Sequence, residues 1–327
     1  MIFKNIFIGS GAGHFSGFKI MVQKDIQDHI RSWKFFVLLS LVLLTCCASS
    51  YSAVAEIMKD INTPLKEGEF LFLKVFTMSN GALPAYYVFL SFLGPLLGIS
   101  LGFDAINGEY SNRTISRILA QPVYRDVLIN SKVLSAIFIV GGLFASLTSV
   151  IIGVTIMVTG QIPEIAELFR IISFLLVTCF YVAFWLNLSV LFSIKFSQAA
   201  TSALTSISIW LFFLVFYPII INLFAQWLAP SIFASGKEIA SYQQLMLSIM
   251  RFAPSQLFMD ATTALLSPQV RSLGPLSMEQ IQGAIPNNLP FLESVKIVWA
   301  QITGLIASST LCFVFSYYSF MRKEVRM

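Results

Sequence analysis

Side chains that could act as nucleophiles, general bases or metal ligands are scarce in this sequence. The two histidines, His14 and His29, both precede the first long apolar stretch. The four cysteines fall inside apolar stretches, without the spacing of a metal site or a secreted disulfide framework: Cys46, Cys47, Cys179 and Cys312. No G-x-x-x-x-G-K-[S/T] phosphate-binding loop occurs, because the nearest Gly-Lys pair, Gly236-Lys237, lacks the preceding glycine and is followed by Glu238. A catalytic site and an ATP-hydrolysing site are therefore both disfavoured.

The charged side chains with a regular spacing lie in one segment, residues 104–132. Glu109, Arg113 and Arg117 stand at i, i+4 and i+8, so they would share one face of a helix. Asn107 is placed to cap that helix. Its opposite face is apolar and contains Ile115, Ile118 and Leu119. We predict a helix whose apolar side lies against the rest of the molecule and whose charged side faces the cytosol.

A second short helix is expected after Pro122, which ends the first one. Asp126 lies in its first turn, where the helix dipole favours an anion. The segment is therefore predicted to form a charged elbow of two short helices. The alternative is a solvated helix stabilised by Glu–Arg pairs at i, i+4, each worth about 0.2 to 0.5 kcal/mol. The spacing alone leaves both interpretations open.

The elements that must position this elbow are membrane helices. The chain is 57% hydrophobic and 11% charged, against roughly 25% charged residues in a soluble domain. A helix needs about 20 apolar residues to cross the hydrocarbon of a bilayer. Six charge-free stretches are long enough: Phe35–Ala55, Val75–Phe103, Val133–Pro163, Ile171–Ile194, Phe196–Gly236 and Ile297–Met321. We predict an all-α integral membrane protein with six transmembrane helices and one transmembrane domain, residues 1–327.

The net charge of +5 indicates membrane topology rather than a nucleic-acid partner. Lys and Arg concentrate in cytoplasmic loops of membrane proteins. With the amino terminus inside, most of them fall in inner segments: Lys4, Lys19, Lys24, Arg31, Lys34, Arg113, Arg117, Arg125, Lys132, Lys195, Arg322, Lys323 and Arg326. We therefore expect a multi-pass protein of the cytoplasmic membrane with both termini in the cytoplasm.

The amino-terminal part is predicted to lie outside the bilayer core. Residues 1–17 are rich in glycine without apolar periodicity, and we expect a mobile tail. In residues 18–34, apolar side chains recur at helical spacing with charged residues on the other faces: Val22, Ile26, Ile30 and Trp33. This pattern predicts an amphipathic helix along the inner membrane surface. A cytoplasmic extension of the first span is the alternative.

Small and hydroxyl side chains mark three of the predicted spans. The second carries a glycine at every fourth position, Gly94, Gly98 and Gly102, and the third carries Gly142, Ser146, Ser149 and Gly153. The fifth carries a mildly polar stripe of Thr201, Ser202, Thr205, Ser206 and Ser208. Close helix packing and helix–helix hydrogen bonds are the default explanation. The alternative hypothesis is that the second and fifth spans line a translocation path or pair two copies of the chain.

The only large loop is predicted outside the membrane, at residues 229–295. It contains two amphipathic candidates, Tyr242–Phe252 and Ser255–Leu266, divided by Pro254. We predict an external helical cap, with a disordered loop as the alternative.

The segment after the second span resembles the inner loop of type-2 ABC exporter permeases. That loop has Gly-Glu, three variable residues, a position usually Gly, then Thr, a Leu/Ile-rich turn, Pro and Arg. The matching residues here are Gly108, Glu109, Thr114, Ile118, Leu119, Pro122 and Arg125, followed by Lys132. Arg113 stands where Gly is common, so the local contacts there are expected to differ. The preceding Phe103-Asp-Ala-Ile106 is most similar to the branch that includes the permease for nitrous oxide reductase maturation.

The resemblance extends to the entry helix, the six-span layout, the Ala253-Pro254-Ser255 turn and the basic tail. It implies the permease half of an ATP-driven exporter that works by alternating access. A separate cassette ATPase would bind ATP and magnesium, and this chain would bind no cofactor. Two permease copies would form the path. The ATPase-coupling residues that it implies are Gly108, Glu109, Arg113, Thr114, Arg117, Pro122, Arg125 and Lys195.

Two alternatives belong to other classes. A secondary transporter would place ionisable residues near the middle of the membrane to couple an ion, and the predicted spans have essentially none there. A non-transporting membrane scaffold or sensor is the other alternative, and stimulation of an ATPase by the purified complex separates it from a transporter.

Overall fold

The computed structural model describes residues 13–60, 70–79, 83–114, 124–229, 236–271, 273 and 289–323. All regular structure within these residues is helical. Within the described part of the chain, six helices are long and apolar enough to cross a membrane: Trp33–Met58, Tyr86–Ser111, Arg125–Thr159, Ile165–Lys195, Ala199–Leu228 and Phe291–Arg322. The prediction of an all-α integral membrane protein with six spans is confirmed.

The first three spans come with short accessory helices. The order is α1 (Gly13–Arg31), α2 (Trp33–Asp60), α3 (Leu71–Thr77), α4 (Tyr86–Gly102), α5 (Asn107–Ser111) and α7 (Arg125–Thr159). The second half contains α8 (Ile165–Lys195), a fifth span in three parts, α9 (Ala199–Leu211), the π-helix η2 (Phe212–Phe216) and α10 (Tyr217–Leu228), then α11 (Gly236–Met250), α12 (Pro254–Leu266) and α14 (Phe291–Arg322).

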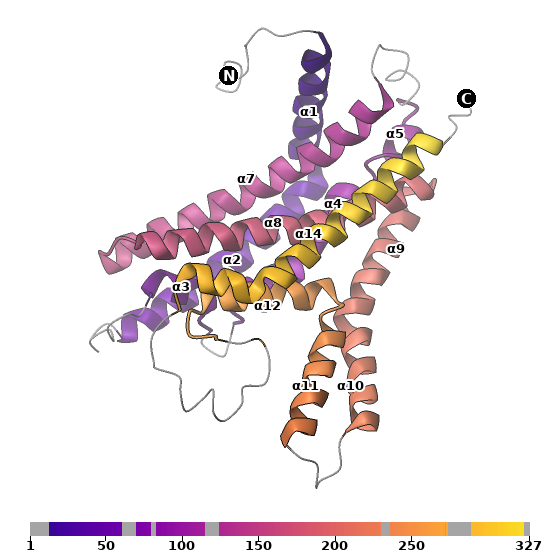
Figure 1. Ribbon diagram of the computed structural model, residues 1–327. Coiled ribbons are helices and arrows are strands. Elements are labelled where there is room, and N and C mark those ends of the chain that lie inside the picture. Colours follow the sequence, from indigo (N-terminus) through magenta and orange to yellow (C-terminus); the bar gives the residue numbers. More distant parts are fainter. Residues whose placement is uncertain are drawn as a thin grey trace.

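Helix α8 is the centre of the bundle. It packs against α4, α7, α9, α12 and α14, and its Tyr181 and Trp185 are fully buried. Figure 1 shows α7, α8 and α14 side by side, while α9 and α10 diverge from them. The termini of the described chain, in α1 and α14, lie at the same end of the molecule as α5 (Figure 1).

The glycine ridge of the second span packs against α8 of the same chain. A Cβ on Gly98 would lie 2.6 Å from the Val182 carbonyl oxygen, and one on Gly102 would lie 2.7 Å from the Leu186 carbonyl oxygen. Backbones this close leave no room for a side chain. The ridge is therefore used for packing within the chain, and its face is not free for a second copy.

The loop after the fifth span contains both predicted helices, and one of them lies inside the bundle rather than over it. Helix α12 begins at Pro254 and packs against α3, α4, α8 and α14. Phe258 is fully buried and stacks on Tyr181, with ring centroids 4.4 Å apart. Helix α11 instead pairs with α10, as Tyr217 donates a hydrogen bond to the Ile249 carbonyl.

Helix α1 differs from its prediction in extent and in the face that it buries. It begins at Gly13, inside the segment expected to be a mobile tail; residues 1–12 of that segment lie outside the described residues. It packs against α7 and α2. Of its predicted apolar residues, Val22 and Ile26 are only half-buried and Ile30 is exposed, whereas Asp25 is 4% exposed. The helix therefore buries an acidic residue against the protein, and its other charged residues, such as Lys24, stay exposed.

Candidate functional site

Helix α5 is fixed at its start by a side chain from the fourth span. The Ser193 hydroxyl on α8 accepts hydrogen bonds from the backbone N–H groups of Ile106 (3.0 Å) and Asn107 (3.1 Å). These are among the donors that a helix amino terminus leaves unsatisfied. Asn107 therefore does not act as the predicted cap: it is the first helical residue, and its buried side-chain amide has no hydrogen-bond partner.

Helix α5 ends after five residues because the chain turns left-handed at Arg113. The φ angle there is 54°, in a region that glycine occupies without strain. The N–H of Thr114 bonds the Glu109 carbonyl and the N–H of Arg113 bonds the Tyr110 carbonyl, which is the Schellman pattern of a helix end. The usual glycine of the family pattern fits this conformation, and this chain adopts it with arginine.

The predicted charged face of Glu109, Arg113 and Arg117 on the first short helix of the elbow is wrong as a result. Arg113 lies beyond the end of α5, so it does not share a helix face with Glu109. The second arm of the predicted elbow is not a separate short helix, because the helix that starts at Arg125 continues as the third span, α7. Asp126 does lie in its first turn, as predicted. Arg117 and Pro122 lie outside the described residues.

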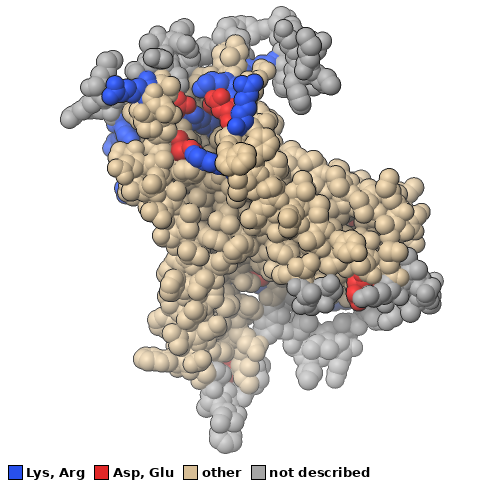
Figure 2. All heavy atoms as spheres, turned by 180° about the vertical axis from the view of Figure 1, so that it is seen from behind, with Lys and Arg blue, Asp and Glu red and all other residues tan. Residues whose placement is uncertain are grey.

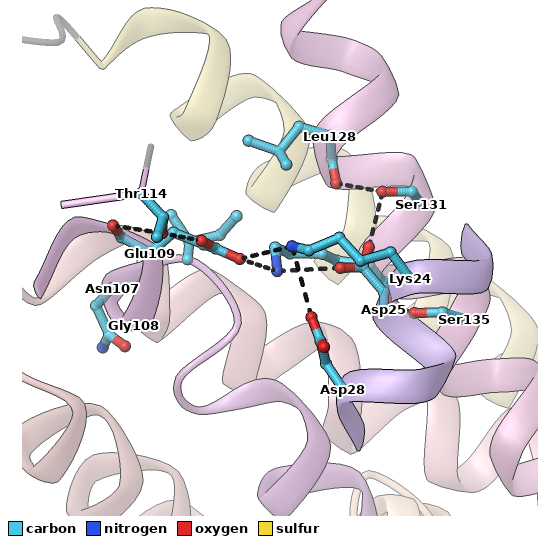
Figure 3. A network of polar contacts seen from close by, with 12 residues as sticks. Lys24, Asp25, Asp28, Asn107, Gly108, Glu109, Thr114, Leu128, Ser131 and Ser135 are labelled. Atoms are coloured by element: carbon cyan, nitrogen blue, oxygen red, sulfur yellow. Dashed lines mark hydrogen bonds and ion pairs between the residues drawn. The ribbon is translucent and has the colours of Figure 1, made fainter. Parts of the chain in front are cut away.

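Glu109 is the hub of a buried charge network rather than a solvated helix residue (Figure 3). Its Oε1 lies 2.9 Å from Lys132 Nζ on α7 and 3.9 Å from Lys24 Nζ on α1. The Thr114 hydroxyl donates to its other carboxylate oxygen. The side chains of Glu109 and Lys132 are only 15% and 10% exposed. Because both side chains are largely shielded from water, removing one of them would leave the charge of the other unpaired, which costs folding free energy.

The network continues from Lys132 into α1. Lys132 Nζ also lies 3.5 Å from Asp25 Oδ1, and the buried Ser131 hydroxyl donates to Asp25 Oδ2 at 3.0 Å. Two carboxylates thus share one buried ammonium, with Lys24 beside them. Through this cluster a surface helix, α5, is joined to the third span and to the amino-terminal helix.

A cavity of about 410 Å³ opens beside the network. Its rim includes Lys34 and Asp104, whose Nζ and Oδ2 lie 2.5 Å apart. Gly108, Glu109, Thr114 and His29 also line it. Burial, and then the charge of Lys132, lower the pKa of His29. The histidine is therefore neutral at pH 7.

Two further predicted coupling residues that the structure describes, Arg125 and Lys195, lie at the same end of the molecule. Arg125 Nη1 donates to the Lys323 carbonyl at 3.2 Å. Lys195 is exposed at the last residue of α8. Figure 2 shows most of the visible Lys, Arg, Asp and Glu gathered at this end, above a face that carries almost no charge. The structure thus brings Gly108, Glu109 and Thr114 together, with Arg113 and Arg125 nearby in the chain.

Sequence reasoning missed the residues that complete the network, namely Lys24, Asp25, Ser131, Ser193 and Lys323. Asp25 is one of the charged residues of the predicted amphipathic helix, and its spacing does not show that it is buried. The sequence offers one signal for it: Lys132 directly precedes the predicted third span, and a lysine at the margin of the membrane is stabilised by a carboxylate nearby.

The hydroxyl stripe of the fifth span divides between two faces. Ser202 and Ser206 are buried against the bundle, and Ser206 bonds the Ser189 hydroxyl of α8 at 3.3 Å. Thr201 and Ser208 are exposed, and Thr205 is partly exposed. Only the second group is available to a path or to another copy.

Comparison with protein families matches residues 20–325 to the ABC-2 family transporter protein. The match covers nearly the whole chain. The chain belongs to the ABC-2 transporter family. In this ABC-2 chain the network around Glu109 lies at the loop on which the sequence resemblance rested. No curated protein matched the chain in a parallel comparison.

Proposed function

We propose that this ABC-2 chain is the permease subunit of an exporter driven by a separate cassette ATPase, which binds ATP and magnesium. The observation that carries the proposal is the network from Glu109 through Lys132 to Asp25. It offers a short, partly buried route by which force on α5 would reach the third span and α1. A helix that is merely solvated has no need of such a connection.

The proposed orientation puts the charged end in the cytoplasm, with both termini there and the protein in the cytoplasmic membrane. The gathering of Lys and Arg around α1, α5 and the carboxyl end supports it (Figure 2). In alternating access, the path would then open in turn to the cytoplasm, at this end of the molecule, and to the opposite side of the membrane, on which α11 lies. The Phe103-Asp-Ala-Ile106 run favours kinship with the nitrous oxide reductase maturation branch, and the cargo is left open by this proposal.

Two copies are proposed to form the path through the fifth span. In the most apolar 18-residue stretch of the fifth span, only 11% of the residues are buried inside the chain. The corresponding share is 61% for the second and fourth spans. The partner face would include the exposed side of α9, with Thr201, Thr205 and Ser208. The glycines at 94, 98 and 102 take no part, since α8 covers them.

The test of ATPase docking uses Arg113, which is exposed. The chain is purified from its native host membranes, and co-purifying ATP hydrolysis is measured. Arg113→Glu is expected to reduce the recovered ATPase activity. Glu293→Lys, an exposed charge reversal in the first turn of α14, is the matched control and should leave it unchanged. Equal recovery with both variants would exclude docking at this turn.

Glu109 tests transmission rather than docking. Charge reversal there would place a cation against Lys132 and damage the fold whether or not an ATPase binds, so Glu109→Gln is the informative change. We expect the ATPase to stay bound while hydrolysis loses its dependence on the permease. Unchanged stimulation in a normally inserted Glu109→Gln complex would contradict the coupling role. A complex without any ATPase would favour the secondary transporter or the scaffold.

A further inference from the structure

Lys323 contacts three elements just beyond the last turn of α14. Its ammonium donates a hydrogen bond to the carbonyl of Ile194, near the end of α8. The same ammonium lies 4.9 Å from the centroid of the Tyr110 ring on α5. Its backbone carbonyl accepts the hydrogen bond from Arg125, the first residue of α7.

The two contacts of the ammonium suit the chemistry of a lysine at this point. The last carbonyls of a helix lack intrahelical partners, and the helix dipole favours a cation beside them. An ammonium also interacts favourably with the face of an aromatic ring. A single compact charge with three donors meets both partners at once, which a neutral side chain of similar length does not.

The other fixed contacts of α5 lead to different spans. Ser193 ties its start to α8, and Glu109 ties its middle to α7 through Lys132. The contact between Lys323 and Tyr110 leads to α14. The sixth span otherwise packs mainly along α8 and α12, with fewer contacts to α7.

We propose that Lys323 is a positioning residue that holds α5 to the cytoplasmic ends of α8 and α14, so that α5 and the sixth span move together. This proposal rests on the proposed role of α5 in coupling. It extends the route beyond Glu109: one branch runs to the third span, and a second branch runs to the sixth.

The test measures the distance between α5 and α14 by electron paramagnetic resonance. Spin labels are attached to Ser111→Cys on α5 and Phe315→Cys on α14, both exposed positions. The four native cysteines are replaced, and the full chain is reconstituted in liposomes without any ATPase. The labelled chain is diluted with an excess of unlabelled cysteine-free chain, so that distances between labelled copies are rare, and the parent should then give one narrow distance distribution.

Lys323→Met should broaden that distribution and shift it to longer distances, and Lys323→Arg, which keeps the charge, should restore it. Arg322→Met is the matched control, because the Arg322 guanidinium lies over Tyr318 of its own helix, 4.5 Å from the ring centroid. If Lys323→Met impairs folding, Tyr110→Leu serves instead and should also broaden the distribution.

A Lys323→Met distribution as narrow as the parent's would overturn the proposal. Equal broadening by Arg322→Met would overturn it too, because the effect would then belong to the end of α14 in general. Since the sample holds no ATPase, the outcome does not depend on whether one docks on α5. Loss of ATPase recovery in the Arg113→Glu experiment tests that point separately.

Discussion

Arg113 ends helix α5 with its backbone in the left-handed region, at a φ angle of 54°. A side chain with a Cβ costs about 1–2 kcal/mol in this left-handed region. The contacts that hold Thr114 and Glu109 together must offset this cost, and charge spacing carries no information about them.

The first prediction is that Arg113→Gly is more stable than Arg113→Ala. Both variants lack the arginine side chain, so the comparison isolates the backbone. Glycine relieves the left-handed strain, and we expect an advantage of about 1 kcal/mol in the free energy of unfolding. The melting temperatures of the two variants in the same detergent are compared. Equal melting temperatures would mean that the turn is not strained.

The second prediction concerns pH and His29. Burial and Lys132 lower its pKa in the folded protein, although Asp25, Asp28 and Asp104 oppose the shift. The unfolded chain therefore binds the proton more readily, at an ordinary pKa of about 6.5. Its contribution to stability is complete above that pH and falls as the pH drops toward the folded pKa.

Replacement by a neutral side chain should remove this part of the acid sensitivity. When the pH is lowered from about 7.5 to about 5.5, we expect the melting temperature of His29→Gln to fall less than that of the parent. Both proteins also contain the carboxylates of the network, so only the difference between them reports on His29. Parallel melting curves over this interval would contradict the prediction.

At the scale of whole helices, the sequence predicts well which membrane helices form. It predicts poorly where a helix ends and which other helices it contacts. Long charge-free stretches predict helical spans because a helix satisfies all of its backbone hydrogen bonds within one segment, as the interior of a bilayer requires. The same composition does not say which helix meets which. Gly98 lies against α8, whereas Gly142 and Gly153 have no neighbouring atom within 4 Å of an added Cβ, yet their sequence patterns look alike.

The third prediction uses that contrast. Gly98→Ala places a Cβ 2.6 Å from a backbone oxygen of α8, so the two helices must separate. Overpacking of this kind costs about 1–3 kcal/mol. The matched control, Gly142→Ala, meets no atom and gains helix propensity, so its melting temperature should be unchanged or slightly higher. Similar losses in both variants would show that the α4–α8 contact is not tightly packed.

At the scale of the whole molecule, burial is distributed unevenly among the spans. The second and fourth spans are well covered by their own chain, and the fifth is not. The fifth span is also interrupted by η2, and single turns of π-helix inside α-helices often occur at functional sites. A span that its own chain hardly covers needs lipid or another protein around it.

The last prediction decides between those surroundings. Single cysteines are placed along residues 201–208 of a chain without its native cysteines, and copper phenanthroline is added to native membranes. If a second copy covers α9, disulfide-linked dimers should form at Thr201, Leu204 and Ser208, which face outward, and not at the buried Ser202 and Ser206. A lipid-covered helix would expose the same positions, so random collisions between copies would also give dimers there, but weak ones whose yield falls as the expression level of the chain is lowered. The dependence of the yield on expression level is therefore the decisive quantity. A high yield on the exposed face that persists at low expression supports pairing through the fifth span, and a yield that falls away would place the contact between copies elsewhere.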